Sequence, residues 1–269
     1  MSDEAAPDEV LYDYADHVAT ITLNAAERMN TLSATMTGRI TELLVAADAN
    51  RDVRAIILTG RGRAFCAGLD LRSARTRTGG ESGGSSNPAT RLDLRNNPPA
   101  TLASIDTPVI AAVNGAAAGY GMDLALGCDF RIMARSAKIS TMFLKRGLVP
   151  ESGCTWLLPR LLGWEKAAEL LMAGRTLDGA ACVEWGLASR VVADDELMPT
   201  AQALAGEIAK NAPLAVQAAK RMMRMGLQEP LPQHMHHVLM QLRALMNTKD
   251  TAEGLAAFLE KREPTFTGE

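Results

Sequence analysis

The chain has 269 residues, of which 28 are basic and 31 acidic, and its formal net charge of −3 argues against nucleic acid as the main ligand. No uncharged apolar run is long enough to span a membrane, so we expect no membrane partner. The four cysteines lie far apart without a CxxC pair, which is typical of reduced thiols in a cytoplasmic protein. Alanine accounts for 44 residues and aromatic residues for only 4%, a composition that suits helices packed closely on each other or on a sheet.

The N-terminal part of the chain combines short strands with one helix. Residues 1–9 are acidic and are expected to form a disordered tail. An alternating, β-rich pattern predicts a hairpin over residues 10–24. Residues 33–50 follow a helical pattern with Ser33 as the N-cap, and the apolar run at 53–59 predicts a buried strand.

Residues 72–99 differ from the rest in being rich in glycine, serine and charged residues. Such a composition predicts a flexible loop. Two interpretations fit it equally well: a lid over a binding site, or a surface insertion without a role.

Strands and helices alternate further along the chain. Strands are predicted at 108–114, 130–134 and 188–192, and helices at 122–127, 165–172 and 179–185. From residue 198 onward the pattern is helical, with breaks at 211–213, near 226 and at 230–232. We therefore predict an α/β core over residues 10–197 and a helical C-terminal region over residues 198–269.

Two predicted strands are each followed by a turn of small residues, at 60–70 and at 114–121. Small residues let a ligand approach the backbone closely, so that N–H groups can point at its oxygen atoms. A helix that begins at the second turn adds the partial positive charge of its N-terminus. Together the two turns predict an oxyanion hole. A dinucleotide site at the second turn is disfavoured, because this is not the first βα turn and no Tyr-x-x-x-Lys follows.

Several ordered motifs make the chain similar to a known family, and they extend from about residue 10 to residue 266. They are residues 28–33 (RMNTLS), 64–70 (AFCAGLD), 108–115 (PVIAAVNG), 128–129 (CD), 147–150 (GLVP), 158–160 (LPR), 181–191 and 253–262. With these motifs the sequence resembles the enoyl-CoA hydratase/isomerase, or crotonase, superfamily.

The resemblance implies an α/β fold, a crotonase-like spiral of ββα units with a C-terminal helical trimerisation region, and a homotrimer or a dimer of trimers. It implies an acyl-CoA thioester as the substrate and no cofactor. The thioester oxygen would be held by the backbone N–H groups of Ala67 and Tyr120. The positions that match the family's CoA contacts are Arg28, Ala64, Asp70, Leu71, Phe258 and Lys261, and those that line the pocket are Phe143, Gly68, Gly119 and Gly121.

The acidic residues decide which reaction the resemblance implies. Family hydratases use two glutamates to activate one water, and the matching positions here hold Asp123 and Phe143. A phenyl ring cannot transfer a proton, so the two-glutamate site is incomplete. Glu151 stands where family isomerases that move a double bond carry an acid, and a single carboxylate there can take a proton from one carbon and return it to another.

The leading prediction is therefore an isomerase that shifts a double bond in an enoyl-CoA, with Glu151 as the base. The first alternative is an enoyl-CoA hydratase that uses Asp123 and Glu151. The second is an acyl-CoA-binding scaffold without catalysis. No metal site is expected, because no carboxylate follows the histidines at 234–237 at ligand spacing, and the methionines between 222 and 246 are expected to pack a helical or subunit interface.

Overall fold

The computed structural model describes residues 8–70 and 97–269. Most of the predicted N-terminal tail and almost all of the predicted loop at 72–99 therefore lie outside the described residues, as does Leu71. The tail prediction was wrong at its last residue, because the carboxylate of Glu9 pairs with Arg28 at 2.6 Å.

A six-stranded sheet forms one side of the core, in the order β1-β2-β3-β5-β7-β10. Its first two strands form the predicted antiparallel hairpin, joined by a two-residue turn in which both residues have positive φ. The other neighbouring pairs are parallel, and the central strands are fully buried apolar runs, as expected when both faces of a sheet are covered. The strands are β1 (Val10–Ala15), β2 (Val18–Leu23), β3 (Ala55–Gly60), β5 (Val109–Val113), β7 (Phe130–Ala134) and β10 (Arg190–Val192).

A second sheet of four short strands was not predicted. Each of its strands has only three residues, too few to show an alternating pattern. Successive pairs β3-β4, β5-β6 and β7-β8 send one strand to each sheet, and a helix follows each pair, which confirms the spiral of ββα units. The strands are β4 (Ala64–Cys66), β6 (Ala116–Ala118), β8 (Lys138–Ser140) and β9 (Thr176–Asp178), and the helices are α3 (Pro98–Leu102), α4 (Tyr120–Gly127) and α5 (Cys154–Leu162).

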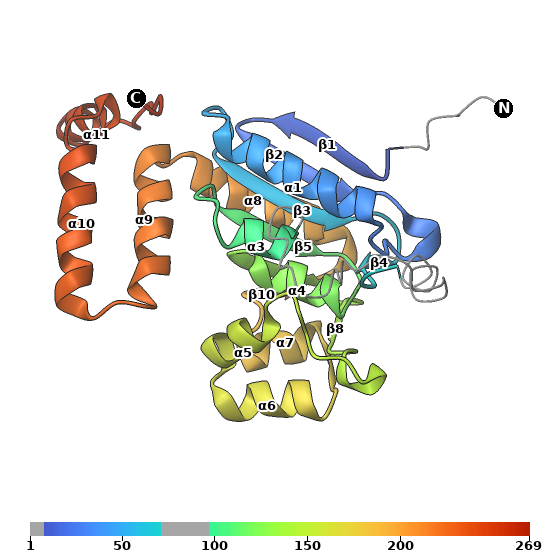
Figure 1. Ribbon diagram of the computed structural model, residues 1–269. Helices are drawn as coiled ribbons and strands as arrows, with labels where there is room; N and C mark the ends of the chain where they lie inside the picture. Colours follow the sequence, from blue (N-terminus) through green and yellow to red (C-terminus); the bar gives the residue numbers. More distant parts are fainter. Residues whose placement is uncertain (1–7, 71–96) are drawn as a thin grey trace, which may run out of the picture.

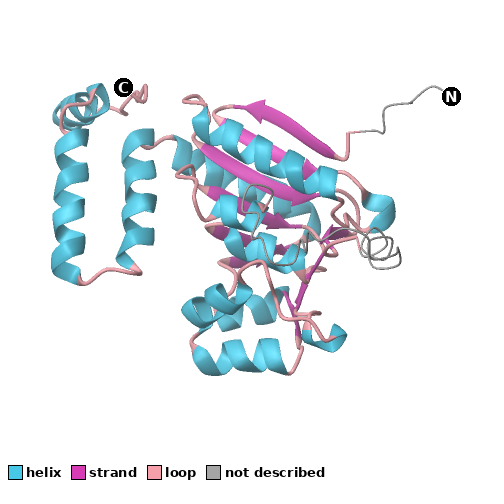
Figure 2. Ribbon diagram, viewed as in Figure 1, coloured by secondary structure: helices cyan, strands magenta, loops and turns pink. Residues whose placement is uncertain are grey.

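Further helices cover the sheets, as Figure 2 shows. In α1 (Ala34–Ala49), the backbone N–H of Met36 donates to Ser33 Oγ at 3.1 Å, which confirms the predicted N-cap. The predicted helices α6 (Trp164–Met172) and α7 (Gly179–Trp185) are present. Helix α5 was not predicted, because it contains a proline and is bounded by glycines with positive φ. Short 3₁₀ turns complete this part of the chain: η1 (Ala26–Arg28), η4 (Leu144–Arg146) and η5 (Asp194–Glu196).

The helical C-terminal region has two parts. Helix α8 (Leu197–Ala209) packs against β2, β3, β5 and β7 through a buried stripe of small residues, so it belongs to the core. The predicted boundary at residue 197 is thus too early. Helices α9 (Pro213–Gly226), α10 (Leu231–Leu245) and α11 (Lys249–Glu260) project from the core, and we call them the arm (Figure 1).

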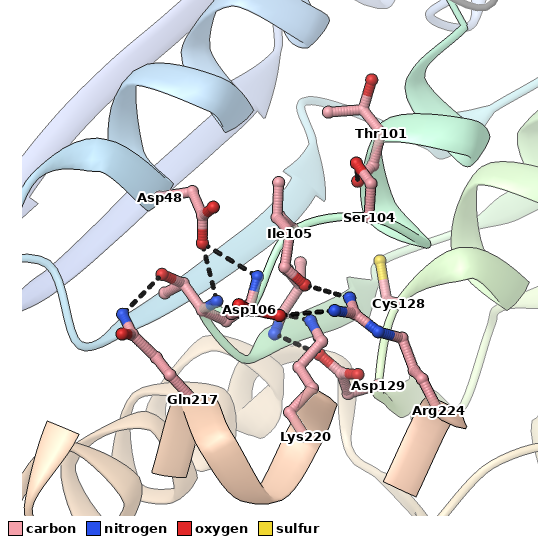
Figure 3. A network of polar contacts seen from close by, with 12 residues as sticks. Asp48, Thr101, Ser104, Ile105, Asp106, Cys128, Asp129, Gln217, Lys220 and Arg224 are labelled. Atoms are coloured by element: carbon pink, nitrogen blue, oxygen red, sulfur yellow. Dashed lines mark hydrogen bonds and ion pairs between the residues drawn. The ribbon is translucent and has the colours of Figure 1, made fainter. Parts of the chain in front are cut away.

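Ion pairs join the first helix of the arm to the core, as Figure 3 shows. Lys220 Nζ lies 2.6 Å from Asp129 Oδ2, and Arg221 Nε donates to Asp106 Oδ2 at 2.8 Å. Arg224 also pairs with Asp106. Asp48 supports the same loop by accepting from the N–H groups of residues 106 and 107. These contacts therefore hold α9 against the segments that precede β5 and β7.

Candidate active site

The two glycine turns predicted from the sequence lie against each other. A Cβ atom on Gly121 would lie 2.0 Å from the carbonyl oxygen of Cys66, so only glycine lets α4 approach β4 this closely. A Cβ on Gly68 would lie 3.9 Å from the backbone nitrogen of Tyr120. Gly119 joins β6 to α4 with φ +55°, a conformation that favours glycine. Gly68, Gly119 and Gly121 thus bring the two turns together.

Two side-chain amides, of which that of Asn30 is buried, hold the first turn in place. Asn30 Nδ2 donates to the carbonyl oxygen of Ala64 at 2.7 Å, and Asn114 Nδ2 donates to the same oxygen at 3.2 Å. Asn114 Oδ1 also accepts from the N–H of Gly60 at 3.0 Å. Both asparagines stand within the recognised motifs, but sequence alone gave no sign that they clamp the turn.

The Ala67 N–H group is already used within the protein. It donates to the carbonyl oxygen of Met29 at 3.0 Å. This hydrogen bond argues against the predicted role of Ala67 as an oxyanion donor, because an engaged N–H cannot also hold a thioester oxygen.

Leu69 offers a free N–H group in its place. Leu69 pairs with Leu32 in a parallel bridge, in which Leu32 bonds to the residues on either side of Leu69. In such a bridge the N–H of Leu69 itself points away from Leu32. No described residue accepts from it. Sequence reasoning missed this donor because the bridge joins segments 37 residues apart and has no local pattern.

The second donor remains the N–H group of Tyr120. It is the first residue of α4, and among the described residues no acceptor bonds to its N–H group. The helix N-terminus adds partial positive charge at the same place. Backbone N–H groups of the two turns are therefore available side by side, which is the arrangement that binds an oxyanion.

Asp123 lies one helical turn after Tyr120 and is fully buried. Its Oδ2 accepts from Ser152 Oγ at 2.5 Å, whereas its Oδ1 has no hydrogen-bond partner among the described residues. Burial raises the pKa of Asp123 to about 6, against the lowering effect of Ser152 and Cys154, and the nearby charge of Glu151 raises it further.

Glu151 is an exposed carboxylate in electrostatic range of the same group of residues. Burial raises the pKa of the Tyr120 hydroxyl, and the negative charges of Glu151 and Asp123 add to that rise. The Tyr120 hydroxyl donates to Asn97 Oδ1 at 3.4 Å. The loop after η4 therefore brings Glu151 to the region where α4 begins.

Phe143 lies beside the second turn, in the position where a family hydratase carries its second acid. Phe143 is 7% exposed, and its Cζ would lie 3.8 Å from a Cβ on Gly119. The ring therefore gives this side of the turn an apolar wall.

Cys66 does not supply a nucleophile at the first turn. Burial raises the pKa of its thiol to about 12, so the thiol stays protonated at neutral pH. All four cysteines are buried and free of disulfides.

The predicted CoA contacts divide into two groups, of which the first lies near the first turn. Arg28 lies next to Met29, whose carbonyl oxygen accepts from the Ala67 N–H group. The Arg28 guanidinium pairs with Glu9. The carbonyl of Ala64 is occupied by the two asparagines. The N–H of Asp70 donates to Leu32 at 2.9 Å.

The second group, Phe258 and Lys261, lies on or just after α11 at the end of the arm. Phe258 is 81% exposed. The tail after α11 is held near the start of β3, where Arg54 Nη2 donates to the carbonyl of Phe266 at 2.7 Å. The glycine turns follow the opposite ends of β3 and β5, and Figure 1 shows α11 far from β4. Within one chain, these two residues therefore do not join the turns.

Comparisons with known proteins agree on one family. A model described as enoyl-CoA hydratase/isomerase matches residues 13–269. The 1,2-epoxyphenylacetyl-CoA isomerase of Escherichia coli is 38% identical over 252 residues, covering 93% of this chain and 95% of that protein. A probable enoyl-CoA hydratase of Mycobacterium leprae is 36% identical over 260 residues, covering 97% and 98%. The crystal structure of an enoyl-CoA hydratase from Bacillus anthracis covers 97% of this chain and 100% of its own, with a TM-score of 0.88 and 35% identity.

The two-sheet spiral and its paired turns are those of the crotonase superfamily of enzymes. The chain belongs to the enoyl-CoA hydratase/isomerase family within it. Of the helices in the part of the chain that the structure describes, none is long and apolar enough to cross a bilayer.

Proposed function

We propose that this enzyme shifts the double bond of a 3-enoyl-CoA to the 2-position. Glu151 removes a proton from C2, and the N–H groups of Leu69 and Tyr120 hold the thioester oxygen of the resulting enolate. The observation that carries this proposal is where the acids stand. The position of the hydratase's second glutamate holds the buried side chain of Phe143, whereas Glu151 is an exposed carboxylate in electrostatic range of Asp123 and Tyr120.

Formation of the enolate is the step of the reaction that needs the most stabilisation. A thioester α-proton is too weakly acidic for a carboxylate to remove unless the enolate oxygen is stabilised. Loss of one donor from an oxyanion hole typically costs about 2.7–4 kcal/mol of transition-state stabilisation. Isomerisation needs this stabilisation and a base, but no activated water and no cofactor beyond the CoA thioester of the substrate.

Two further observations support isomerisation. The apolar wall formed by Phe143 leaves no second acid there to orient water. The relative from Escherichia coli is named as an isomerase of a CoA ester, although of a different substrate.

Hydration of a 2-enoyl-CoA is the second candidate. It is favoured by the Oδ1 atom of Asp123, which is buried without a partner and could orient a water. Several relatives carry hydratase names, such as the one from Mycobacterium leprae. In this reaction Asp123 and Glu151 would share the acid and base roles.

The decisive variant is Glu151→Gln, assayed on a 3-enoyl-CoA and on crotonyl-CoA. We expect kcat for isomerisation to fall by at least about 100-fold with little change in KM, because the base is lost while CoA binding is kept. The matched control is Glu184→Gln, which removes an exposed glutamate from α7.

Each other outcome has a distinct meaning. Undiminished isomerisation by Glu151→Gln would remove Glu151 as the base. Hydration of crotonyl-CoA faster than isomerisation would favour the hydratase. Binding of acyl-CoA without turnover of either substrate would identify a non-catalytic scaffold.

Assembly is the remaining part of this proposal: a homotrimer or a dimer of trimers, formed through the arm. Large apolar side chains on the arm are half or more exposed in the single chain, which is unusual for a free surface. They are Met223, Leu227, Leu231, Met235, Leu239, Met246, Leu255, Phe258 and Leu259.

A further inference from the structure

Ser152 directly follows Glu151 in the chain and holds the other carboxylate of the site. Its side chain is buried, and its hydroxyl donates to Asp123 Oδ2 at 2.5 Å. The remaining oxygen, Asp123 Oδ1, is buried and lacks a partner in the part of the chain that the structure describes. Because an unsatisfied buried carboxylate oxygen is destabilising, its retention points to a ligand that completes it.

The charges around Asp123 fit a proton-carrying role. Glu151 faces it from the neighbouring loop, the Cys154 thiol from the start of α5, and the Tyr120 hydroxyl from its own helix. No cation contributes to its electrostatic surroundings among the described residues. Burial raises the pKa of Asp123 to about 6, and the Ser152 hydrogen bond limits that rise.

We propose that Ser152 is a positioning residue, which fixes Asp123 by one oxygen so that the other oxygen serves the substrate. The proposal rests on the proposed isomerisation and deepens it, because it gives the site two working carboxylates. Nothing in the family motifs singled out Ser152; its role follows from its hydrogen bond to Asp123 and from the unpartnered oxygen.

The proton balance of such a site is simple. Glu151 takes a proton from C2, and the electron pair moves onto the thioester oxygen. When the pair returns, the new double bond forms between C2 and C3, and C4 takes its proton from the Asp123 carboxylic acid. The proton left on Glu151 then passes to the Asp123 carboxylate through solvent, which restores both groups.

The test compares Ser152→Ala, Asp123→Asn and the double variant on a 3-enoyl-CoA. We expect Ser152→Ala to lower kcat by about 10–100-fold with KM changed less than about 3-fold, and to have less than about a 2-fold effect in the Asp123→Asn background. In Ser152→Ala the Asp123 carboxylate loses a hydrogen-bond donor, so the pKa of Asp123 should rise. The alkaline limb of the pH profile of kcat/KM, where the Asp123 acid loses its proton, should therefore move to higher pH. Ser152→Thr keeps the hydroxyl and should return the limb toward its original pH.

Two results would overturn the proposal. The first is that Ser152→Ala lowers kcat by the same factor in the parent chain and in the Asp123→Asn background. The second is a lower melting temperature without any shift of the pH limb, which would mean that the contact is only structural.

A measurement without turnover separates this proposal from the proposed function. The carboxyl ¹³C shift of Asp123, assigned with Asp123→Asn, should titrate at higher pH in Ser152→Ala than in the parent chain. If the parent chain isomerises nothing but this shift is seen, isomerisation fails and the Ser152 contact stands. If isomerisation occurs but the shift is absent, the Ser152 proposal fails alone.

Discussion

Burial of the charged Asp123 carboxylate destabilises the folded state. Its carboxyl binds a proton more tightly in the folded chain, where its pKa is about 6, than in the unfolded chain, where the ordinary value is 3.8. The folded state therefore holds more protons between these values, and the free energy of unfolding falls as the pH rises from about 4 to about 6, then levels off. The difference of about 2 pH units corresponds to about 3 kcal/mol at most.

Asp123→Asn should accordingly stabilise the protein while it impairs catalysis. Asparagine keeps an oxygen for Ser152 but carries no charge, so we expect a gain of about 1–3 kcal/mol above pH 7 that shrinks toward pH 4. Urea unfolding at fixed protein concentration over this pH range measures it. Asp13→Asn, on an exposed stretch of β1, is the control. A gain that is the same at pH 4.5 and at pH 8 would contradict the assignment.

For single residues, the sequence predicted the positions of candidate side chains better than the identity of the backbone donors. Asp123, Glu151, Phe143 and Tyr120 could be placed because each holds a fixed offset from a motif. The donor in the first turn could not, since the choice between Ala67 and Leu69 depends on which N–H group already bonds to residues 29 and 32. Such long-range bonds leave no periodic signal.

Among the elements, the first arm helix, α9, is joined to the core by a cluster of ion pairs. Asp106 pairs with Arg224, as Figure 3 shows. It also accepts from Arg221, and its side chain is only 20% exposed. Hydrogen bonds to charged groups contribute about 1.5–3 kcal/mol, and partial exposure of the arginines reduces that figure.

Asp106→Asn should loosen α9 from the core. We expect a loss of about 1–2 kcal/mol in the free energy of unfolding and faster amide hydrogen exchange in α9, both smaller at high salt because ions screen partly exposed pairs. Hydrogen exchange followed by mass spectrometry reports the α9 effect directly. The expectation fails if exchange quickens equally in α6, which contributes no residue to this network.

The helices and strands also differ in how well a sequence pattern predicts them. Segments such as 33–50 and 130–134 were predicted within a residue or two, because the first has a helical pattern and the second is a short, mostly apolar run. The second sheet escaped prediction because its strands are three residues long and form only when the spiral brings them together. Resemblance to the family supplied the spiral that periodicity alone could not.

For the molecule as a whole, one chain does not bring together all the residues that the family resemblance assigns to CoA. Phe258 and Lys261 lie at the far end of the arm, away from the turns, while the arm exposes a row of large apolar side chains. Both facts are explained if the arm packs on a second copy and delivers these residues to its site. In an assembly with closed cyclic symmetry, each subunit would then receive the arm of one neighbour at its own site and extend its own arm to another site.

Mixing two impaired variants tests this arrangement. One variant carries Glu151→Gln and the other carries Phe258→Ala with Lys261→Ala, so each alone should have low activity on a 3-enoyl-CoA at low substrate concentration. After subunit exchange, a site with an intact Glu151 can meet an intact arm, and random mixing in a cyclic trimer predicts about a quarter of the activity of the parent chain. Light scattering should show three or six copies in every sample. Activity that stays at the average of the two variants, although exchange is demonstrated by a mass tag, would mean that the arm serves no neighbouring site.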